Sequence, residues 1–181
     1  MLQDDDLQAV QRSAEAVTSL QGTTGEFSVN SSVRARRVLL ATGWGGLTAA
    51  TDTEHVHTAR TVPHDWLFPR TAAVIHHGGS GTTHAGLKAG RPTLICPFIG
   101  DQSFWGHRIH DLGAGPAPLP SRKITDARLR PAIEQLLNDH DLHERAAHLG
   151  NQIRTESGVA AAIHIITNTR TTTPADSTDT Q

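Results

Sequence analysis

The sequence has a single cysteine, no strongly basic segment and no long apolar run. Cys96 stands alone among 181 residues, which excludes an internal disulfide framework and indicates a reducing compartment. We interpret Cys96, within the apolar run TLICPF, as a small buried residue rather than a nucleophile. The formal net charge is −2, and no basic face or RNA-binding aromatic signature is present, so no nucleic-acid partner is predicted. No segment reaches the roughly 20 apolar residues that a transmembrane helix requires.

Both ends of the chain are poor in large apolar side chains. Residues 1–10, MLQDDDLQAV, are acidic where a secretory signal would be basic and then apolar, so we expect a cytoplasmic protein. The compositions of residues 21–36 and 169–181 are typical of solvated coil, because they bury too little surface to offset chain entropy. The sequence therefore predicts a partial N-terminal helix and polar linker over residues 1–36, one compact domain over 37–168, and a disordered tail from 169.

Short apolar runs alternate with helical patterns along the chain. The expected strands are residues 38–41, 55–62, 72–77 and 91–98, and the expected helices are residues 6–20, 82–90, 101–113, 124–139 and one or two over 141–167, with a turn or single helical turn at 65–68. This alternation predicts an α/β fold, a Rossmann-like parallel sheet flanked by helices. Ligands of such sheets bind beyond the carboxyl ends of the strands, where GWGG, HHGGSGTT and PFIGDQ are expected.

The stretch HHGGSGTT, residues 76–83, joins a predicted strand to a predicted helix. Exposed amides and the positive end of the dipole at a helix start favour an anion, and three glycines would let a phosphate approach without meeting a Cβ. His77, Thr82 and Thr83 supply further donors. A turn that needs glycine for its geometry alone remains an alternative, although it explains neither His77 nor the paired threonines. Because neither GxGxxG nor a P-loop is present, a dinucleotide or triphosphate motif is not supported.

The central part of the sequence resembles a known family of enzymes. Residues 62–120 resemble the nucleotide-sugar-binding half of family 1 glycosyltransferases with the GT-B fold, in the branch of sterol 3-beta-glucosyltransferases and antibiotic glycosyltransferases. The similarity runs from about residue 37 to residue 166, and it is most specific in HHGGSGTT, the AGRP that follows, and PFIGDQSFWG. The resemblance implies that the chain folds as the C-terminal, donor-binding domain of such an enzyme.

The resemblance also implies a role for individual residues. Those implied for the donor pyrophosphate are His77, Gly79, Ser80, Gly81, Thr82 and Thr83, those for the transferred sugar are Asp101, Gln102 and Trp105, and those for the uridine are Trp44, Val62 and His64. A carboxylate and an amide can together bind the two hydroxyls of a diol. The donor substrate is a UDP-sugar, and neither a cofactor nor a metal ion is implied.

The sequence departs from the family pattern in two places. Ala85 stands where plant members of the wider family place a glutamate on the ribose hydroxyls, so ribose recognition must come from elsewhere. The acceptor pocket and the catalytic base of these enzymes lie in an N-terminal domain, and no matching stretch precedes Arg37. We therefore assign no catalytic residue, and we expect the first strand of the donor-binding domain to be missing from residues 1–20.

The implied reaction is transfer of a hexose, glucose by preference, from a UDP-sugar to a hydroxyl of a lipophilic acceptor such as a sterol. The 181 residues alone are expected to bind the donor without efficient turnover unless a partner chain supplies the N-terminal half. Two alternatives remain. In the first, the chain is a non-catalytic UDP-sugar-binding module or auxiliary subunit. In the second, it is a fragment that folds poorly because a missing first strand leaves a sheet edge exposed.

Twelve histidines and several aromatic residues suggest other interpretations. The histidine pairs considered as metal ligands are His55/His57, His76/His77 and His107/His110. Because HExxH and a cysteine pair are both absent from the sequence, no metal site is predicted. The aromatic residues expected to pack in the core rather than stack on a sugar are Trp66, Phe68 and Phe104.

Overall fold

The computed structural model describes residues 16–19, 38–41, 56–59 and 61–169. Within them lies a parallel five-stranded sheet with the order β3-β2-β1-β4-β5. Its strands are β1 (Ala16–Ser19), β2 (Val38–Ala41), β3 (Val56–Ala59), β4 (Ala73–His76) and β5 (Thr93–Ile95). The predicted strands at 38–41, 55–62, 72–77 and 91–98 are confirmed, with shorter bounds. The predicted disordered tail beyond residue 169 lies outside the described residues.

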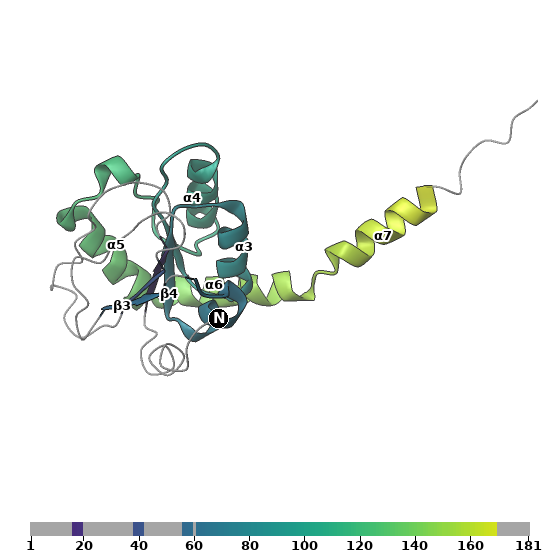
Figure 1. Ribbon diagram of the computed structural model, residues 1–181, viewed down its shortest axis with the longest axis horizontal. Helices are drawn as coiled ribbons and strands as arrows, with labels where there is room; N and C mark the ends of the chain where they lie inside the picture. The colour runs from purple at the N-terminus through teal and green to yellow at the C-terminus, as the bar shows by residue number, and fades with distance from the viewer. Residues whose placement is uncertain (1–15, 20–37, 42–55, 60, 170–181) are drawn as a thin grey trace, which may run out of the picture.

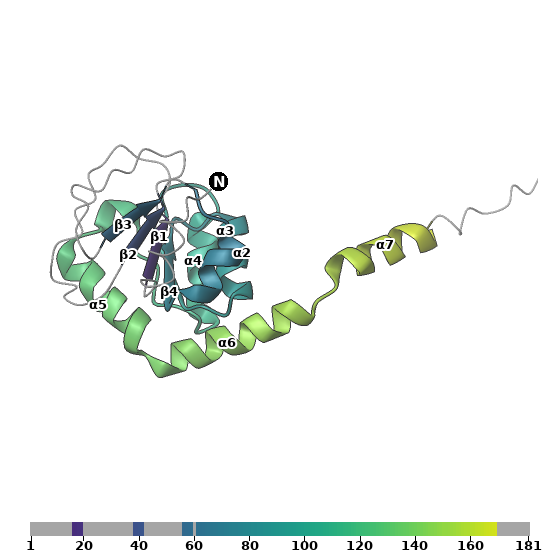
Figure 2. The same ribbon diagram turned by 60° about the horizontal axis from the view of Figure 1, so that its bottom comes forward.

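Helices cover both faces of this sheet (Figure 2). In chain order they are α2 (His64–Leu67), the 3-10 helix η1 (Phe68–Arg70), α3 (Ser80–Lys88), α4 (Gln102–Asp111), the 3-10 helix η2 (Ser121–Lys123), α5 (Asp126–Asn138), α6 (His140–Thr155) and α7 (Gly158–Thr169). Helices α2, α3 and α4 lie on one face and α5 on the other, while α7 extends away from the body (Figures 1 and 2). The fold is therefore the predicted α/β, Rossmann-like arrangement. No helix within the described ranges is both long and apolar enough to cross a bilayer.

The alternation of side chains along β4 explains how the sheet is covered on both faces. Ala73 and Ile75 pack in the cluster that includes Leu136 of α5. Val74 packs on the other face, in the cluster that holds Leu67 and Phe68. All four residues of β4 are buried, which is typical of a central strand in a parallel sheet. Because side chains alternate, His76 shares the face of Val74 and points to the side of α2 and α3.

Strand β1 corrects two expectations. Residues 16–19 form a strand, so the helix predicted over residues 6–20 is wrong at its C-terminal end. The first strand is also present, and it lies between β2 and β4 rather than being missing. Its ladder pairs Val17 with Leu39 on one side and with Val74 on the other. The exposed edge expected from a missing first strand therefore does not exist, and the poorly folding alternative loses its basis.

The structure tests the interpretation of four single residues. Cys96 is buried, and burial raises the pKa of its thiol to about 12, so it remains a protonated, unreactive core residue. Phe68 is fully buried as expected, and Trp66 packs against the same core cluster. Phe104 contradicts the expectation of core packing, because 61% of its surface is exposed on α4.

Candidate functional site

The order of the strands places one end of β4 at a special position in the sheet. The chain runs from β1 outward to β2 and β3, and it later continues on the opposite side of β1 through β4 and β5. In open parallel sheets the crevice for a ligand forms at such a reversal, outside the carboxyl ends of the strands. Ser19 and His76 are paired at the ends of β1 and β4. Residues 77–83 follow β4 at this end of the sheet.

The N-terminus of α3 begins directly after β4, two residues earlier than predicted. Gly79 is its N-cap, and no side chain caps the helix. The first amide to donate within the helix is that of Thr83, to the carbonyl oxygen of Gly79 at 2.9 Å. The amides of Ser80, Gly81 and Thr82 therefore precede the first intrahelical hydrogen bond. Uncapped amides and the positive end of the helix dipole are features that favour a bound anion.

The surroundings of Gly81 leave this position accessible. Ser80 and Gly81 are exposed, and a Cβ added at Gly81 would meet no atom within 4 Å. Thr83 differs from the rest of the predicted set. It is fully buried, and its hydroxyl donates to the Gly79 carbonyl oxygen at 2.9 Å. Thr83 therefore stabilises the first turn of α3, while the exposed side of the turn is formed by the residues before it.

Two histidines at the end of β4 have buried nitrogens without a hydrogen-bond partner among the described residues, Nε2 of His76 and Nδ1 of His77. The ring of His77 is half-buried and lies against Gly79, where an added Cβ would be 2.7 Å from Nε2. Burial lowers the pKa of His77, so the ring is neutral near pH 7. Because buried polar groups usually have partners, unpartnered nitrogens beside a helix N-terminus indicate a place for a ligand or water.

The fully buried ring of His76 sets the shape of the turn. The amide of Gly78 donates to its Nδ1 at 3.0 Å, so the neutral ring carries its proton on Nε2. Burial, and to a lesser extent the nearby His77 and His64, lower the pKa of His76 to about 3. The pattern of residues that predicted the site did not single out His76, because its role depends on where the turn folds back.

The pKa of His76 predicts an acid-sensitive fold. The ordinary pKa of histidine is 6.5, so below that pH residue 76 is protonated in the unfolded chain. In the folded chain His76 stays neutral until the pH falls to about 3. Stability is therefore lost as the pH falls through this window, at up to about 1.4 kcal/mol per pH unit. We expect the free energy of unfolding of His76→Asn, measured with urea at pH 7 and pH 5, to change with pH by about 1 kcal/mol per unit less than that of the native chain. If the free energy of unfolding changed equally with pH in both proteins, the lowered pKa of His76 would be contradicted.

Gly78 joins this turn to the loop that follows β5. Its φ is +98°, and an added Cβ would lie 2.7 Å from Cγ2 of Ile95 and 3.0 Å from the carbonyl oxygen of Gln102. The main chain of the turn thus touches the start of α4 with no room for a side chain between them. The two most specific motifs of the sequence, HHGGSGTT and PFIGDQSFWG, are therefore brought together.

Asp101 and Gln102 begin α4 and are held by different contacts. Oδ2 of Asp101 accepts a hydrogen bond from Nε1 of Trp105 at 3.0 Å, which leaves Oδ1 as an acceptor. Oε1 of Gln102 accepts from the backbone amides of Phe98 and Ile99 at 2.7 and 3.1 Å. The NH₂ group of Gln102 is therefore the part of this side chain that can donate to a ligand. One fixed acceptor and one fixed donor suit a pair of neighbouring hydroxyls.

His84 is a neighbour of the site that the sequence reasoning missed. Its Nδ1 lies 2.8 Å from the carbonyl oxygen of Ser80, one turn back in α3. Its ring meets the ring of Trp105 edge to face, with centroids 5.2 Å apart and an interplanar angle of 71°. Sequence spacing places His84 on the outer side of α3, but nothing in the pattern indicates that α4 supplies a ring beside it.

The structure describes two of the three residues predicted for the uridine, Val62 and His64. Val62 is buried in the core cluster that contains Leu67 and Phe68, so its side chain is used in packing. His64 is half-buried and stacks on Phe68, with ring centroids 4.6 Å apart. Trp44 lies outside the described residues. The set therefore stays a prediction.

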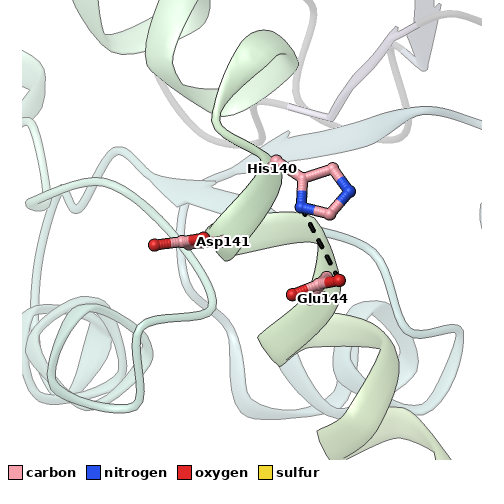
Figure 3. Close-up of side chains that lie close together, drawn as sticks. All are labelled: His140, Asp141 and Glu144. Carbon is pink, nitrogen blue, oxygen red and sulfur yellow. Dashed lines mark ion pairs between the residues drawn. The ribbon is translucent and has the colours of Figure 1, made fainter.

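A possible metal site lies elsewhere, on the first turn of α6. His140, Asp141 and Glu144 form the one group of three or more potential ligands within the described ranges, and their ligand atoms lie within 4.8 Å of one another (Figure 3). All three side chains are exposed, and Nδ1 of His140 is 3.6 Å from Oε1 of Glu144. Such an i, i+4 pair is a common surface contact, and we assign it no metal.

Comparison with known proteins decides the family. Residues 46–167 match the family described as erythromycin biosynthesis protein CIII-like, C-terminal domain. The chain belongs to this family. The chain is also similar to curated sterol 3-beta-glucosyltransferases, among them the following two. It is 46% identical over 129 residues to sterol 3-beta-glucosyltransferase UGT80A2 of Arabidopsis thaliana, covering 71% of this chain and 20% of that protein. It is 42% identical over 138 residues to the sterol 3-beta-glucosyltransferase of Yarrowia lipolytica, covering 72% of this chain and 9% of that protein.

Solved structures share the fold of this CIII-like C-terminal domain. The calicheamicin glycosyltransferase CalG4 superposes with a TM-score of 0.75 at 21% identity, covering 90% of this chain and 45% of that one. The glycosyltransferase of kitacinnamycin superposes with a TM-score of 0.70 at 21% identity, covering 87% of this chain and 44% of that one. The fold is that of the C-terminal domain of GT-B glycosyltransferases. The chain spans a fifth or less of the length of the curated relatives named above and less than half of these solved chains.

Proposed function

We propose that this domain binds a UDP-hexose, with glucose preferred, and that it is the donor-binding half of an enzyme that transfers the hexose to a hydroxyl of a lipophilic acceptor such as a sterol. The observation that carries the proposal is the uncapped start of α3 beside Asp101 and Gln102. The names of the relatives, sterol 3-beta-glucosyltransferases, support the choice of sugar and acceptor.

The diphosphate of the donor would lie on the amides of Ser80, Gly81 and Thr82, which precede the first intrahelical hydrogen bond of α3. As the acceptor oxygen attacks the anomeric carbon, the bond from that carbon to the diphosphate breaks and negative charge collects on the departing UDP. The dipole of α3 would stabilise this charge without reorganising, and an N–H of His77, whose ring lies against Gly79, would add a hydrogen bond. The catalytic power of this half therefore consists of stabilising the leaving group.

The hexose would extend from the diphosphate toward the start of α4. Oδ1 of Asp101 would accept from one sugar hydroxyl while the NH₂ of Gln102 donates to its neighbour. Both side chains are held by other contacts before the sugar arrives, which lowers the entropy cost of binding. The base that takes the proton of the acceptor hydroxyl is assigned to none of these residues. We propose that the 181 residues bind the donor without efficient turnover until an N-terminal half is supplied.

Titration with UDP-glucose tests this function. His77→Ala is expected to weaken binding about 10- to 100-fold, because a hydrogen bond to a charged group contributes about 1.5–3 kcal/mol. His107→Ala, which alters an exposed histidine on α4, is the matched control and is expected to bind like the native chain. Calorimetry measures all three. Native protein that does not bind UDP-glucose, or His77→Ala that binds it equally well, would overturn the proposal.

A non-catalytic UDP-sugar-binding module is the second candidate, because none of the described residues of the candidate site is assigned as the catalytic base. The two candidates differ in one measurement. Mixing the chain with a separately produced N-terminal half of a sterol glucosyltransferase and a sterol acceptor restores transfer if the chain is the donor-binding half of an enzyme. Tight binding of UDP-glucose without transfer in that mixture would favour the binding module.

A further inference from the structure

Three side chains on two helices form a continuous line across the candidate site. On α3, Nδ1 of His84 lies 2.8 Å from the carbonyl oxygen of Ser80. Between the helices, the ring of His84 meets the ring of Trp105 edge to face at 5.2 Å. On α4, Nε1 of Trp105 donates to Oδ2 of Asp101 at 3.0 Å. Each contact uses a different atom or face, so no contact excludes another.

We infer that His84 is a positioning residue that couples the diphosphate turn of α3 to Asp101 on α4. The inference rests on the proposed function and extends it to a residue outside the predicted set. Since a carbonyl oxygen can only accept, the contact with Ser80 fixes the tautomer, with the proton on Nδ1. The ring is then held against Trp105, and Trp105 in turn orients the carboxylate of Asp101.

The chemical surroundings explain why Asp101 needs this support. It is exposed and stands at the N-cap of α4, but its side chain does not cap the helix. Among the described residues, Trp105 is the one that donates a hydrogen bond to its carboxylate. Trp105 is half-buried, with Phe104 on one side and His84 on another. Phe104 is 61% exposed and belongs to the same helix, so His84 is the contact that ties Trp105 to α3.

This coupling predicts a specific change in ligand binding when His84 is removed. The contacts of His84 are with the carbonyl oxygen of Ser80 and the ring of Trp105, so its loss reaches Asp101 through Trp105. The diphosphate would still find its amides on α3, while the sugar would meet a carboxylate that is no longer oriented. The ratio of the dissociation constants for UDP and UDP-glucose should therefore fall, with the affinity for UDP itself unchanged.

The experiment measures the indole of Trp105 and the two ligands in the full chain. In ¹⁵N spectra of the unliganded protein, His84→Ala is expected to shift the indole N–H signal of Trp105 and to speed its exchange with water. His84→Phe keeps a ring edge beside Trp105 and should hold that signal near its native position. In ligand titrations, His84→Ala should lower the ratio of the dissociation constant for UDP to that for UDP-glucose about three- to tenfold. Trp105→Phe should do the same, and the double variant should add little further.

The outcomes separate the inference from the proposed function. An indole signal that does not change in His84→Ala overturns the inference, whatever binds. A changed indole signal with an unchanged UDP to UDP-glucose ratio, in a native chain that binds both, also overturns it. Failure of the native chain to bind UDP overturns the proposed function instead, and the indole spectra then still decide whether His84 positions Trp105. Thermal unfolding of each variant shows whether a loss comes from misfolding.

Discussion

Gly81→Asp is expected to weaken UDP binding by at least about 30-fold while the fold stays intact. The new carboxylate would stand on the first turn of α3, where a Cβ meets no atom within 4 Å. A negative charge there stabilises the helix by about 0.3–1 kcal/mol, but it repels a diphosphate at contact distance by about 1–4 kcal/mol for each phosphate charge. Thermal unfolding and calorimetry with UDP measure the two effects.

Gly81→Asn is the matched control for this prediction. Asparagine has nearly the shape of aspartate without its charge, so it is expected to retain most of the UDP affinity. A loss of equal size in both variants would mean that shape rather than charge closes the position. Gly81→Asp that binds UDP as tightly as the native chain would show that no anion lies at the start of α3.

Gly78→Ala is expected to destabilise the fold by about 2–5 kcal/mol. A positive φ costs a residue with a side chain about 1–2 kcal/mol, and overpacking adds about 1–3 kcal/mol. Both costs apply, because φ is +98° and the new methyl group would lie 2.7 Å from Ile95 and 3.0 Å from the backbone of Gln102. To relieve the contact, the turn must move away from α4.

The measurement is urea unfolding of Gly78→Ala beside Gly81→Ala. The second variant adds the same methyl group to the same turn, in open space, and should leave the stability unchanged or raise it by up to about 1 kcal/mol. If Gly78→Ala lost less than about 0.5 kcal/mol, the close approach of the two loops would be refuted.

The part of the fold from β3 onward could be predicted because local and tertiary signals agree there. The runs AAVIHH and RPTLIC are short, apolar and bounded by glycine or proline, and both form buried strands. Gly90 and Gly113 have positive φ just past the ends of α3 and α4, near the ends of the predicted helices at 82–90 and 101–113. The order of the strands could not be derived from these signals, because the pairing of β1 between β2 and β4 depends on contacts far apart in sequence.

Strand β1 shows why a helical pattern can mislead. Val17 lies at a helical spacing from Val10 and Ala14, which favoured a helix. Residues 16–19 are nevertheless paired on both sides, with β2 and with β4. A strand in the middle of a sheet gains two ladders of hydrogen bonds, and this tertiary gain outweighs the weak preference of a short segment.

The turn between β4 and α3 was predictable from the sequence, but the contacts within the candidate site were not. Glycines and a histidine after a strand predicted the turn, and the resemblance added Asp101 and Gln102. The sequence could not show that Thr83 uses its hydroxyl within the helix, since this depends on α3 starting at Ser80. Nor could it show that His84 meets Trp105, because that contact joins two helices whose packing is set by the sheet.

Titration of ¹⁵N-labelled chain with UDP tests the central claim most directly, because it observes the amides that are said to hold the diphosphate. We predict that the amide signals of Ser80, Gly81 and Thr82 shift together as UDP binds, and that those of Asp101 and Gln102 respond further to UDP-glucose. UDP that binds while the signals of residues 80–82 stay unchanged would contradict it.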